Sequence, residues 1–184
     1  RVICIVQRPT RTQSRGARLV LVLGVPKGGK LDECVRMATE LGVHEIALLQ
    51  AERSLPRWDE RRARSRIERL TRIAAEAAAQ CERSDLPTIH PPRALGDVLS
   101  DVPASAATVV FGARAEGAFT LPELPEQVWC AVGPEGGFSD AEGQQFESAG
   151  FTFASLGPTV LRVDTAVAAA LAVVGDRVHG LQAR

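Results

Sequence analysis

The sequence lacks the features of membrane proteins and of disulfide-rich secreted proteins. No apolar run in its 184 residues approaches the roughly 20 residues that a membrane-spanning helix needs. Its four cysteines lie far apart and include no C-x-x-C pair, which disfavours a zinc site and a disulfide framework. We therefore expect a cytoplasmic protein without a metal, because free thiols persist in a reducing compartment.

The chain also lacks an initiator methionine and a charged-then-apolar leader, so we expect it to be a fragment of a longer gene product. It contains no internal repeat and no low-complexity tract. Its length allows one full domain, since a domain usually has about 100–200 residues.

Lysine is scarce, and the basic charge is unevenly placed. Two of the 22 basic residues are lysine, and 20 are arginine. Residues 1–93 carry a formal charge of +7 from 18 basic and 11 acidic residues, whereas residues 94–184 carry −7 from 4 basic and 11 acidic residues. A guanidinium group offers phosphate a planar fork of donors, so the first half indicates nucleic-acid binding. A genome whose base composition favours arginine codons would explain the same excess.

Strands that alternate with helices predict an α/β domain with a largely parallel sheet. We expect a short strand at residues 1–7 and then a polar, basic linker over residues 8–18. Further strands are expected at 19–25, 44–49, 88–90, 107–112, 127–133 and 152–155, and helices at 31–41, 60–83, 94–99, 139–149 and 164–178. Ligands of such folds bind beyond the carboxyl ends of the strands, which directs attention to the loops after Gly112, Val132 and Ser155.

The first of two distinctive segments is VGPEGGFSDAE, residues 132–142. Three glycines in five positions let the backbone turn and approach a ligand closely. Ser139 and Glu142 have the S-x-x-E spacing of a capping box on the next helix. A tight strand-to-helix turn would explain the capping box but not the presence of Glu135 among the glycines. The spacing matches neither a Rossmann nor a P-loop phosphate site.

The second segment is SLGPTVLRVDTA, residues 155–166, in which a Gly-Pro loop and a lone arginine precede an apolar helix. We expect Thr165 or Asp164 to cap this helix and Arg162 to lie at its mouth. A loop followed by a helix cap is the simpler alternative for this stretch alone.

Together, GPEGGFSDAE and LGPTVLRVDTA resemble the motifs of the RsmE-type ribosomal RNA (uracil-N3)-methyltransferases of the SPOUT class. The resemblance extends upstream to PKGGK at 26–30, ATELGV at 38–43, ERS at 52–54 and EAAAQCER at 76–83. It implies an α/β SPOUT methyltransferase fold with a C-terminal deep trefoil knot and a mostly parallel sheet flanked by helices. It also implies that residues 1–15 are the remnant of an N-terminal PUA-like RNA-binding domain, and that residues 16–184 form the methyltransferase domain.

The resemblance further implies a homodimer that binds S-adenosylmethionine in the knot, with the adenine held by backbone groups of three loops. The matching cofactor-binding positions are Phe111, Gly112, Val132, Gly133, Pro134, Gly137, Leu156, Gly157, Leu161, Arg162 and Thr165. Two positions depart from the family pattern. Thr159 stands where a basic residue is usual, and Asp164 replaces the commoner glutamate.

The implied reaction is methylation of a uridine at N3 in 16S ribosomal RNA of the small ribosomal subunit. Because N3–H is weakly acidic, we expect Arg162 to stabilise the forming anion. We expect either Glu76 or Glu135 to accept the proton or to orient the base. Two other functions stay open: a SPOUT methyltransferase that acts on another ribosomal or transfer RNA position, and a catalytically inactive knotted RNA-binding dimer.

A polar stripe along the predicted helix 60–83 agrees with an RNA substrate. A dense run of arginines between residues 53 and 66 precedes and enters this helix, and Trp58 within it is a candidate to stack on a base. A solvated helix face would produce the same charge pattern. The expected RNA-binding residues are Arg53, Arg69, Arg72, Gln80 and Arg83. The three histidines, His44, His90 and His179, are expected to be structural or surface residues.

Overall fold

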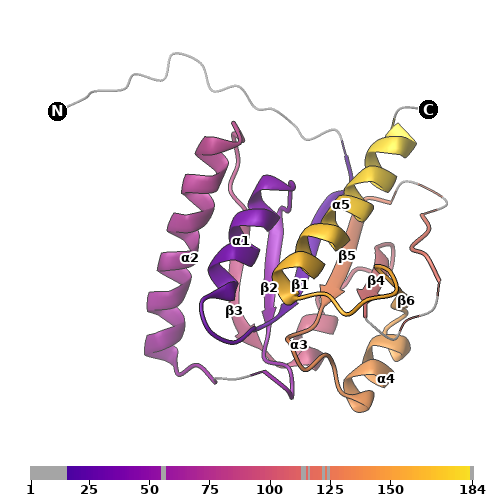
Figure 1. The fold of residues 1–184 in the computed structure, drawn as a ribbon, viewed down its shortest axis with the longest axis horizontal. Coiled ribbons are helices and arrows are strands. Elements are labelled where there is room, and N and C mark those ends of the chain that lie inside the picture. The colour runs from indigo at the N-terminus through magenta and orange to yellow at the C-terminus, as the bar shows by residue number, and fades with distance from the viewer. Residues whose placement is uncertain are drawn as a thin grey trace.

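The computed structural model describes residues 16–54, 57–112, 115, 117–121, 123 and 125–182. Six strands form one sheet in the order β3-β2-β1-β5-β4-β6, and every pair of neighbours is parallel (Figure 1). The strands are β1 (Arg18–Gly24), β2 (Glu45–Leu49), β3 (Thr88–Arg93), β4 (Ala107–Phe111), β5 (Gln127–Val132) and β6 (Thr152–Ala154). The helices are α1 (Lys30–Glu40), α2 (Glu60–Gln80), α3 (Leu95–Leu99), α4 (Asp140–Ser148) and α5 (Val163–Gln182).

Helices cover both faces of the sheet, which gives a three-layer arrangement. Leu21 and Leu23 of β1 belong to a core formed with α1, α2 and α5, which lie side by side over one face (Figure 1). Val20 and Val22 of the same strand belong to a second core formed with α3 and α4. Burial on both faces explains why the central strands are almost continuously apolar rather than alternating.

The predicted fold class is confirmed, and every helix and strand predicted within the described residues is present. The strand expected at residues 1–7 and the domain boundary expected at residue 15 involve residues outside the described part. Most element ends agree with the predictions within one residue. No helix in the described part of the chain combines the length and apolar character needed to span a membrane.

Three predicted bounds were wrong by three residues or more, each for a local reason. β3 continues through Pro91 and Pro92, because it is an edge strand and a proline without an N–H is tolerated there. α2 ends at Gln80 rather than at residue 83, and Glu82 adopts a left-handed conformation with φ 61°. α5 extends to Gln182, well past the predicted end at residue 178.

The predicted cap of α5 was also wrong. The helix begins at Val163, so Asp164 and Thr165 lie within its first turn instead of capping it. Arg162 occupies the capping position, where its carbonyl oxygen accepts a hydrogen bond from the N–H of Ala166 at 2.7 Å. The guanidinium group of Arg162 is therefore attached at the point where the loop enters the helix.

Candidate functional site

A pocket lies at the carboxyl ends of β4, β5 and β6, beside the N-terminus of α5. Parallel strands end at the same edge of the sheet, so the three loops that follow these neighbouring strands meet there. The cavity has a volume of about 140 Å³. Its walls are formed by Phe111, Gly112, Val132, Gly133, Pro134, Glu135, Gly137, Phe138, Leu156, Gly157, Thr159, Val160, Leu161, Val163 and Ala166.

The structure brings nine of the eleven expected cofactor-binding residues into this one pocket. The two others, Arg162 and Thr165, are exposed and do not line it, although residues on either side of them do. The prediction missed five lining residues, Phe138, Thr159, Val160, Val163 and Ala166. Val163 and Ala166 lie three residues apart and so on one side of the first turns of α5. Their helical spacing beside the motif was the available signal.

Glycines shape the pocket at two points. A Cβ atom on Gly133 would lie 3.3 Å from backbone atoms of Gly137 and Phe138, so the two ends of this loop pack backbone against backbone. Gly157 has φ +128°, a conformation that L-residues with side chains rarely adopt. The loops therefore come together without intervening side chains, which leaves a narrow slot.

The predicted capping box of α4 is confirmed. Ser139 Oγ accepts a hydrogen bond from Glu142 N–H at 3.2 Å, and Glu142 Oε2 accepts one from Ser139 N–H at 2.8 Å. The second carboxylate oxygen, Oε1, accepts a hydrogen bond from Glu52 N–H at 2.8 Å. Glu142 is 6% exposed, so this carboxylate is a buried link between the start of α4 and the loop after β2.

Glu135 has a partner that explains its place among the glycines. Its carboxylate accepts hydrogen bonds from Lys27 N–H at 3.1 Å and 3.3 Å, and Lys30 Nζ lies 3.7 Å from Oε1. The acidic side chain therefore attaches the glycine loop to the loop after β1. Because Glu135 also lines the pocket, one of the two expected catalytic carboxylates lies at the cavity.

Cys34 of α1 lies near two acidic side chains, Asp164 of α5 and Glu135. Burial, together with the negative charges of Asp164 and Glu135, raises the pKa of the Cys34 thiol to about 12. Asp164 Oδ1 is a buried atom without a hydrogen-bond partner in the described part of the chain. No cluster of three or more metal-ligating side chains occurs among the described residues.

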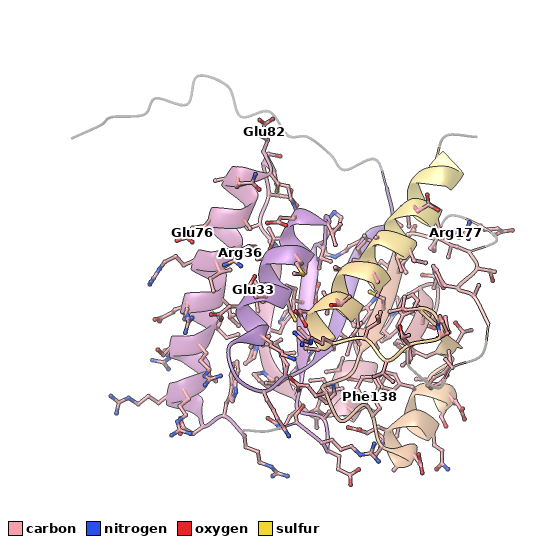
Figure 2. All side chains as sticks on the ribbon, viewed as in Figure 1. Glu33, Arg36, Glu76, Glu82, Phe138 and Arg177 are labelled. Carbon is pink, nitrogen blue, oxygen red and sulfur yellow. The ribbon has the colours of Figure 1, made fainter. Side chains whose placement is uncertain are left out.

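Glu76, the other expected catalytic carboxylate, lies elsewhere. Its exposed side chain projects from the outer side of α2, away from α1 and the sheet (Figure 2). It is not among the residues that line the pocket. Arg72 and Gln80 are exposed on the same helix.

Three of the expected RNA-binding arginines make bonds within the chain. Arg53 donates to the carbonyl oxygens of Gly136 and Phe138 at 2.9 Å and 3.2 Å. Arg69 forms an ion pair with Asp32, which joins α2 to α1.

Arg83 donates to the carbonyl oxygens of Thr39 and Val43 at 2.6 Å and 3.0 Å and pairs with Asp85. Trp58 also makes its contacts within the chain. Its ring packs against the core, and the guanidinium group of Arg66 lies over the ring, 4.8 Å from its centroid.

Known proteins are similar to this chain in sequence and in fold. Ribosomal RNA small subunit methyltransferase E of Bacillus subtilis is 31% identical over 166 residues, which cover 85% of this chain and 65% of that protein. The Synechocystis protein of the same name is 35% identical over 162 residues, which cover 85% of this chain and 52% of its own. This chain thus spans about half to two thirds of the length of these relatives.

A crystal structure of a ribosomal RNA small subunit methyltransferase E from Neisseria gonorrhoeae, bound to S-adenosyl methionine, superposes with a TM-score of 0.81. It is 26% identical and covers 90% of this chain and 68% of that one. These matches confirm the predicted resemblance and the SPOUT fold class, and the knot itself stays a prediction. A family model described as the RNA methyltransferase domain matches residues 13–175. The chain therefore belongs to the family of RNA methyltransferase domains.

Proposed function

We propose that this chain binds S-adenosylmethionine in the pocket after β4, β5 and β6 and methylates N3 of a uridine in 16S ribosomal RNA of the small ribosomal subunit, in the cytoplasm. The observation that carries the proposal is the convergence of nine motif residues from three loops on one cavity. The similarity to proteins named ribosomal RNA small subunit methyltransferase E supports the substrate, and the bound cofactor of the N. gonorrhoeae structure supports the ligand.

The walls of the pocket suit a flat, uncharged ring. Built Cβ atoms on Gly112 and Gly157 meet no protein atom within 4 Å, so these glycines leave free space at the cavity. The surrounding side chains are mainly apolar, and backbone amides and carbonyls at the strand ends can bond the edge of an adenine. When bound, the cofactor supplies a methyl group on a positively charged sulfur. The residues proposed to hold it are Phe111, Gly112, Val132, Gly133, Pro134, Gly137, Leu156, Gly157, Leu161, Arg162 and Thr165.

The proposed reaction requires that uracil N3 lose its proton, which leaves negative charge on the ring oxygens. The Arg162 guanidinium is exposed at the entry to α5 and has no ion-pair partner in the described part of the chain, so it is free to stabilise that charge. Between the two carboxylates considered, we assign the proton or the orientation of the base to Glu135, because it lines the pocket. Glu76 projects from the outer side of α2 (Figure 2).

The size of the pocket supports a homodimer. Small-molecule sites usually have volumes of about 300–1,000 Å³. This chain alone forms a cavity of about 140 Å³, which a second surface would enlarge toward that range. Val160, an apolar residue in the pocket wall, is 82% exposed, and a second copy of the chain would cover it.

The RNA would bind the surface formed by α2 and the segment just before it. Arg72 and Gln80 are exposed on α2 and available to phosphate groups, as are the exposed arginines near the start of the helix, Arg57, Arg61 and Arg64. Arg53, Arg69 and Arg83 are already bonded within the chain, which assigns the phosphate contacts mainly to the α2 surface.

Titration calorimetry with S-adenosylmethionine and S-adenosylhomocysteine tests the cofactor site, and nucleoside analysis of treated small ribosomal subunits tests the reaction. We expect saturable binding, N3-methyluridine as the product, and a loss of about 10²-fold in turnover for Arg162→Ala. Glu135→Gln should lower turnover more than Glu76→Gln. Arg36→Ala serves as the matched control, because this exposed arginine pairs with Glu33 of its own helix.

Three results would contradict parts of the proposal. A different methylated nucleoside would move the substrate to another RNA position. Cofactor binding without any methylated product would favour the RNA-binding dimer. Full activity of Arg162→Ala would remove this residue from the mechanism.

A further inference from the structure

Arg53 lies along the glycine loop rather than out in solvent. Its Nη1 group donates hydrogen bonds to the carbonyl oxygens of Gly136 and Phe138 at 2.9 Å and 3.2 Å. A Cβ atom built on Gly136 would lie 3.1 Å from Arg53 Cβ and 3.3 Å from Arg53 Cδ. The aliphatic part of the side chain therefore packs directly on Gly136. Its guanidinium group bonds the carbonyl oxygens of Gly136 and Phe138.

The segment that carries Arg53 is itself fixed. Ser54 N–H donates to Ala51 O at 2.9 Å, which closes a turn after β2. Ala51 and Ser54 are buried, at 2% and 4% exposure. Glu52 N–H donates to the buried carboxylate of Glu142 at 2.8 Å. The residues before and after Arg53 are therefore both hydrogen-bonded. From this fixed turn, the Arg53 side chain can hold the backbone that it contacts.

The backbone that Arg53 contacts has a hydrogen bond within its own loop, from Gly137 N–H to Pro134 O at 2.8 Å. Gly136 and Gly137 are adjacent and have no side chains, and Gly137 has φ +66°. Glycine loses more conformational freedom on ordering than any other residue, so such a pair is held in one conformation more firmly where bonds from another segment add to its own. Gly137 and Phe138 line the pocket, so the conformation of this stretch determines the shape of the cavity wall.

We propose that Arg53 is a positioning residue that holds the Gly136–Phe138 backbone in the conformation that the cofactor pocket requires. This inference rests on the proposed cofactor site and replaces the RNA contact that the sequence predicts for Arg53. A guanidinium is suited to the task because the two hydrogens of Nη1 point in fixed directions within the planar group and each can bond one carbonyl oxygen, whereas an ammonium group is a point charge on a flexible stem. A preorganised wall binds a ligand more tightly because less conformational entropy is lost on binding.

Arg53→Met is the main test, because it retains the aliphatic stem on Gly136 and removes both hydrogen bonds. In the cofactor-free protein, hydrogen exchange of the amides in residues 133–139 should accelerate. By calorimetry, S-adenosylmethionine should bind about three- to tenfold more weakly, as expected for the loss of exposed, charge-assisted hydrogen bonds. The cofactor KM should rise by a similar factor while kcat at saturation stays within about twofold.

Lysine at this position provides the conservative variant. Arg53→Lys should restore part of the exchange protection and part of the cofactor affinity, since its ammonium group keeps a charged donor but lacks the fixed geometry of the guanidinium. The matched control, Arg36→Ala, removes one exposed positive charge on α1 and should change neither property. If Arg53→Met does not fold, hydrogen exchange and cofactor affinity are measured for Arg53→Lys instead and compared with the wild type.

The RNA-contact alternative gives the opposite pattern. A residue that contacts phosphate would lower the slope of log affinity for RNA against log salt by about 0.9 when removed, with cofactor affinity unchanged. That result, together with unchanged exchange in residues 133–139, would overturn the proposal. Failure of the wild-type chain to bind cofactor would count against the proposed function instead, and exchange in the two variants would still decide whether Arg53 holds the loop.

Discussion

The two glycine-containing loops that form the pocket are held in very different ways. Residues 133–139 are bonded to the loop after β1 through Glu135 and to the loop after β2 through Arg53 and Glu142. In residues 155–162, the hydrogen bonds to other segments of the described chain occur at Ser155, whose N–H donates to Gly117 O at 2.9 Å. The stretch from Gly157 to Val160 is exposed throughout.

The difference shows that glycine content alone does not indicate which wall of a site is adaptable. Both loops contain glycine and both turn sharply, yet the first is bonded to two other loops and the second is open to solvent. We interpret residues 133–139 as the fixed wall and residues 155–162 as the wall that can adjust to a ligand or to a second subunit. Four substitutions test this contrast.

The largest effect on stability is expected from Glu142→Ala in α4, which removes bonds that hold the fixed wall. This change leaves the N–H groups of Ser139 and Glu52 without their acceptor, and Glu142 is buried. The free energy of unfolding should fall by about 3 kcal/mol, as measured by urea denaturation. Ser139→Ala removes the cap alone and should cost about 1 kcal/mol. Equal losses for the two variants would show that the bond to Glu52 contributes nothing.

Gly24→Ala should also damage the fixed wall, by steric overlap. The new Cβ atom would lie 2.4 Å from Pro134 Cδ and 2.8 Å from Pro134 N. We expect a loss of about 1–3 kcal/mol in the free energy of unfolding, together with weaker binding of S-adenosylmethionine. The control is Gly96→Ala in α3, where a Cβ meets nothing within 4 Å. The control should stabilise the chain by up to about 1 kcal/mol, and a similar gain for Gly24→Ala would refute the close approach.

A smaller effect is expected from Ser155→Ala in the adjustable wall. Ser155 Oγ donates to Gly157 O at 3.0 Å and accepts from Gly157 N–H at 3.2 Å, so the change removes bonds that are local and partly exposed. The free energy of unfolding should fall by about 0.5–1 kcal/mol, as measured by urea denaturation. A loss as large as that of Glu142→Ala would mean that this wall is also an anchored element.

The smallest effect on unfolding is expected from Val160→Ser. Because Val160 is 82% exposed, the free energy of unfolding at low protein concentration should change by less than about 0.5 kcal/mol. In the proposed homodimer, the same change should weaken association, as measured by light scattering over a dilution series. Unchanged association would show that the second copy does not cover this residue.

The fold was predictable from the sequence because its signals are local. The apolar run Leu19–Leu23 and the spacing of Leu31, Val35 and Ala38 mark buried faces that the structure confirms. Ser139 and Glu142 act within one helical turn, so their capping box was predictable as well. His44 also matches its predicted structural role, since its Nδ1 accepts Leu19 N–H at 3.2 Å and burial lowers its pKa.

The roles of the arginines were not predictable in this way, because their partners are remote in sequence. Arg69 pairs with a residue 37 positions away, and Arg53 bonds carbonyl oxygens 83 and 85 positions away. A charge pattern shows which side chains are polar. It does not show whether such a side chain already bonds a carbonyl oxygen that is far away in the sequence. The position of Asp164 inside α5 was missed for a local reason, since the helix begins at Val163, two residues before the start that a cap at Asp164 would give.

The bonds that fix residues 133–139 also have a consequence for the order of folding. They join positions that are 83 to 108 residues apart, and chains dominated by such distant contacts fold slowly. During synthesis, β1, β2 and the turn with Arg53 emerge long before the glycine loop that they will hold, and α5 emerges after that loop. A nascent chain can therefore begin to assemble its sheet without a cofactor pocket. Competence to bind the proposed cofactor would be acquired only after residues 155–166 have emerged, well after the first strands of the sheet.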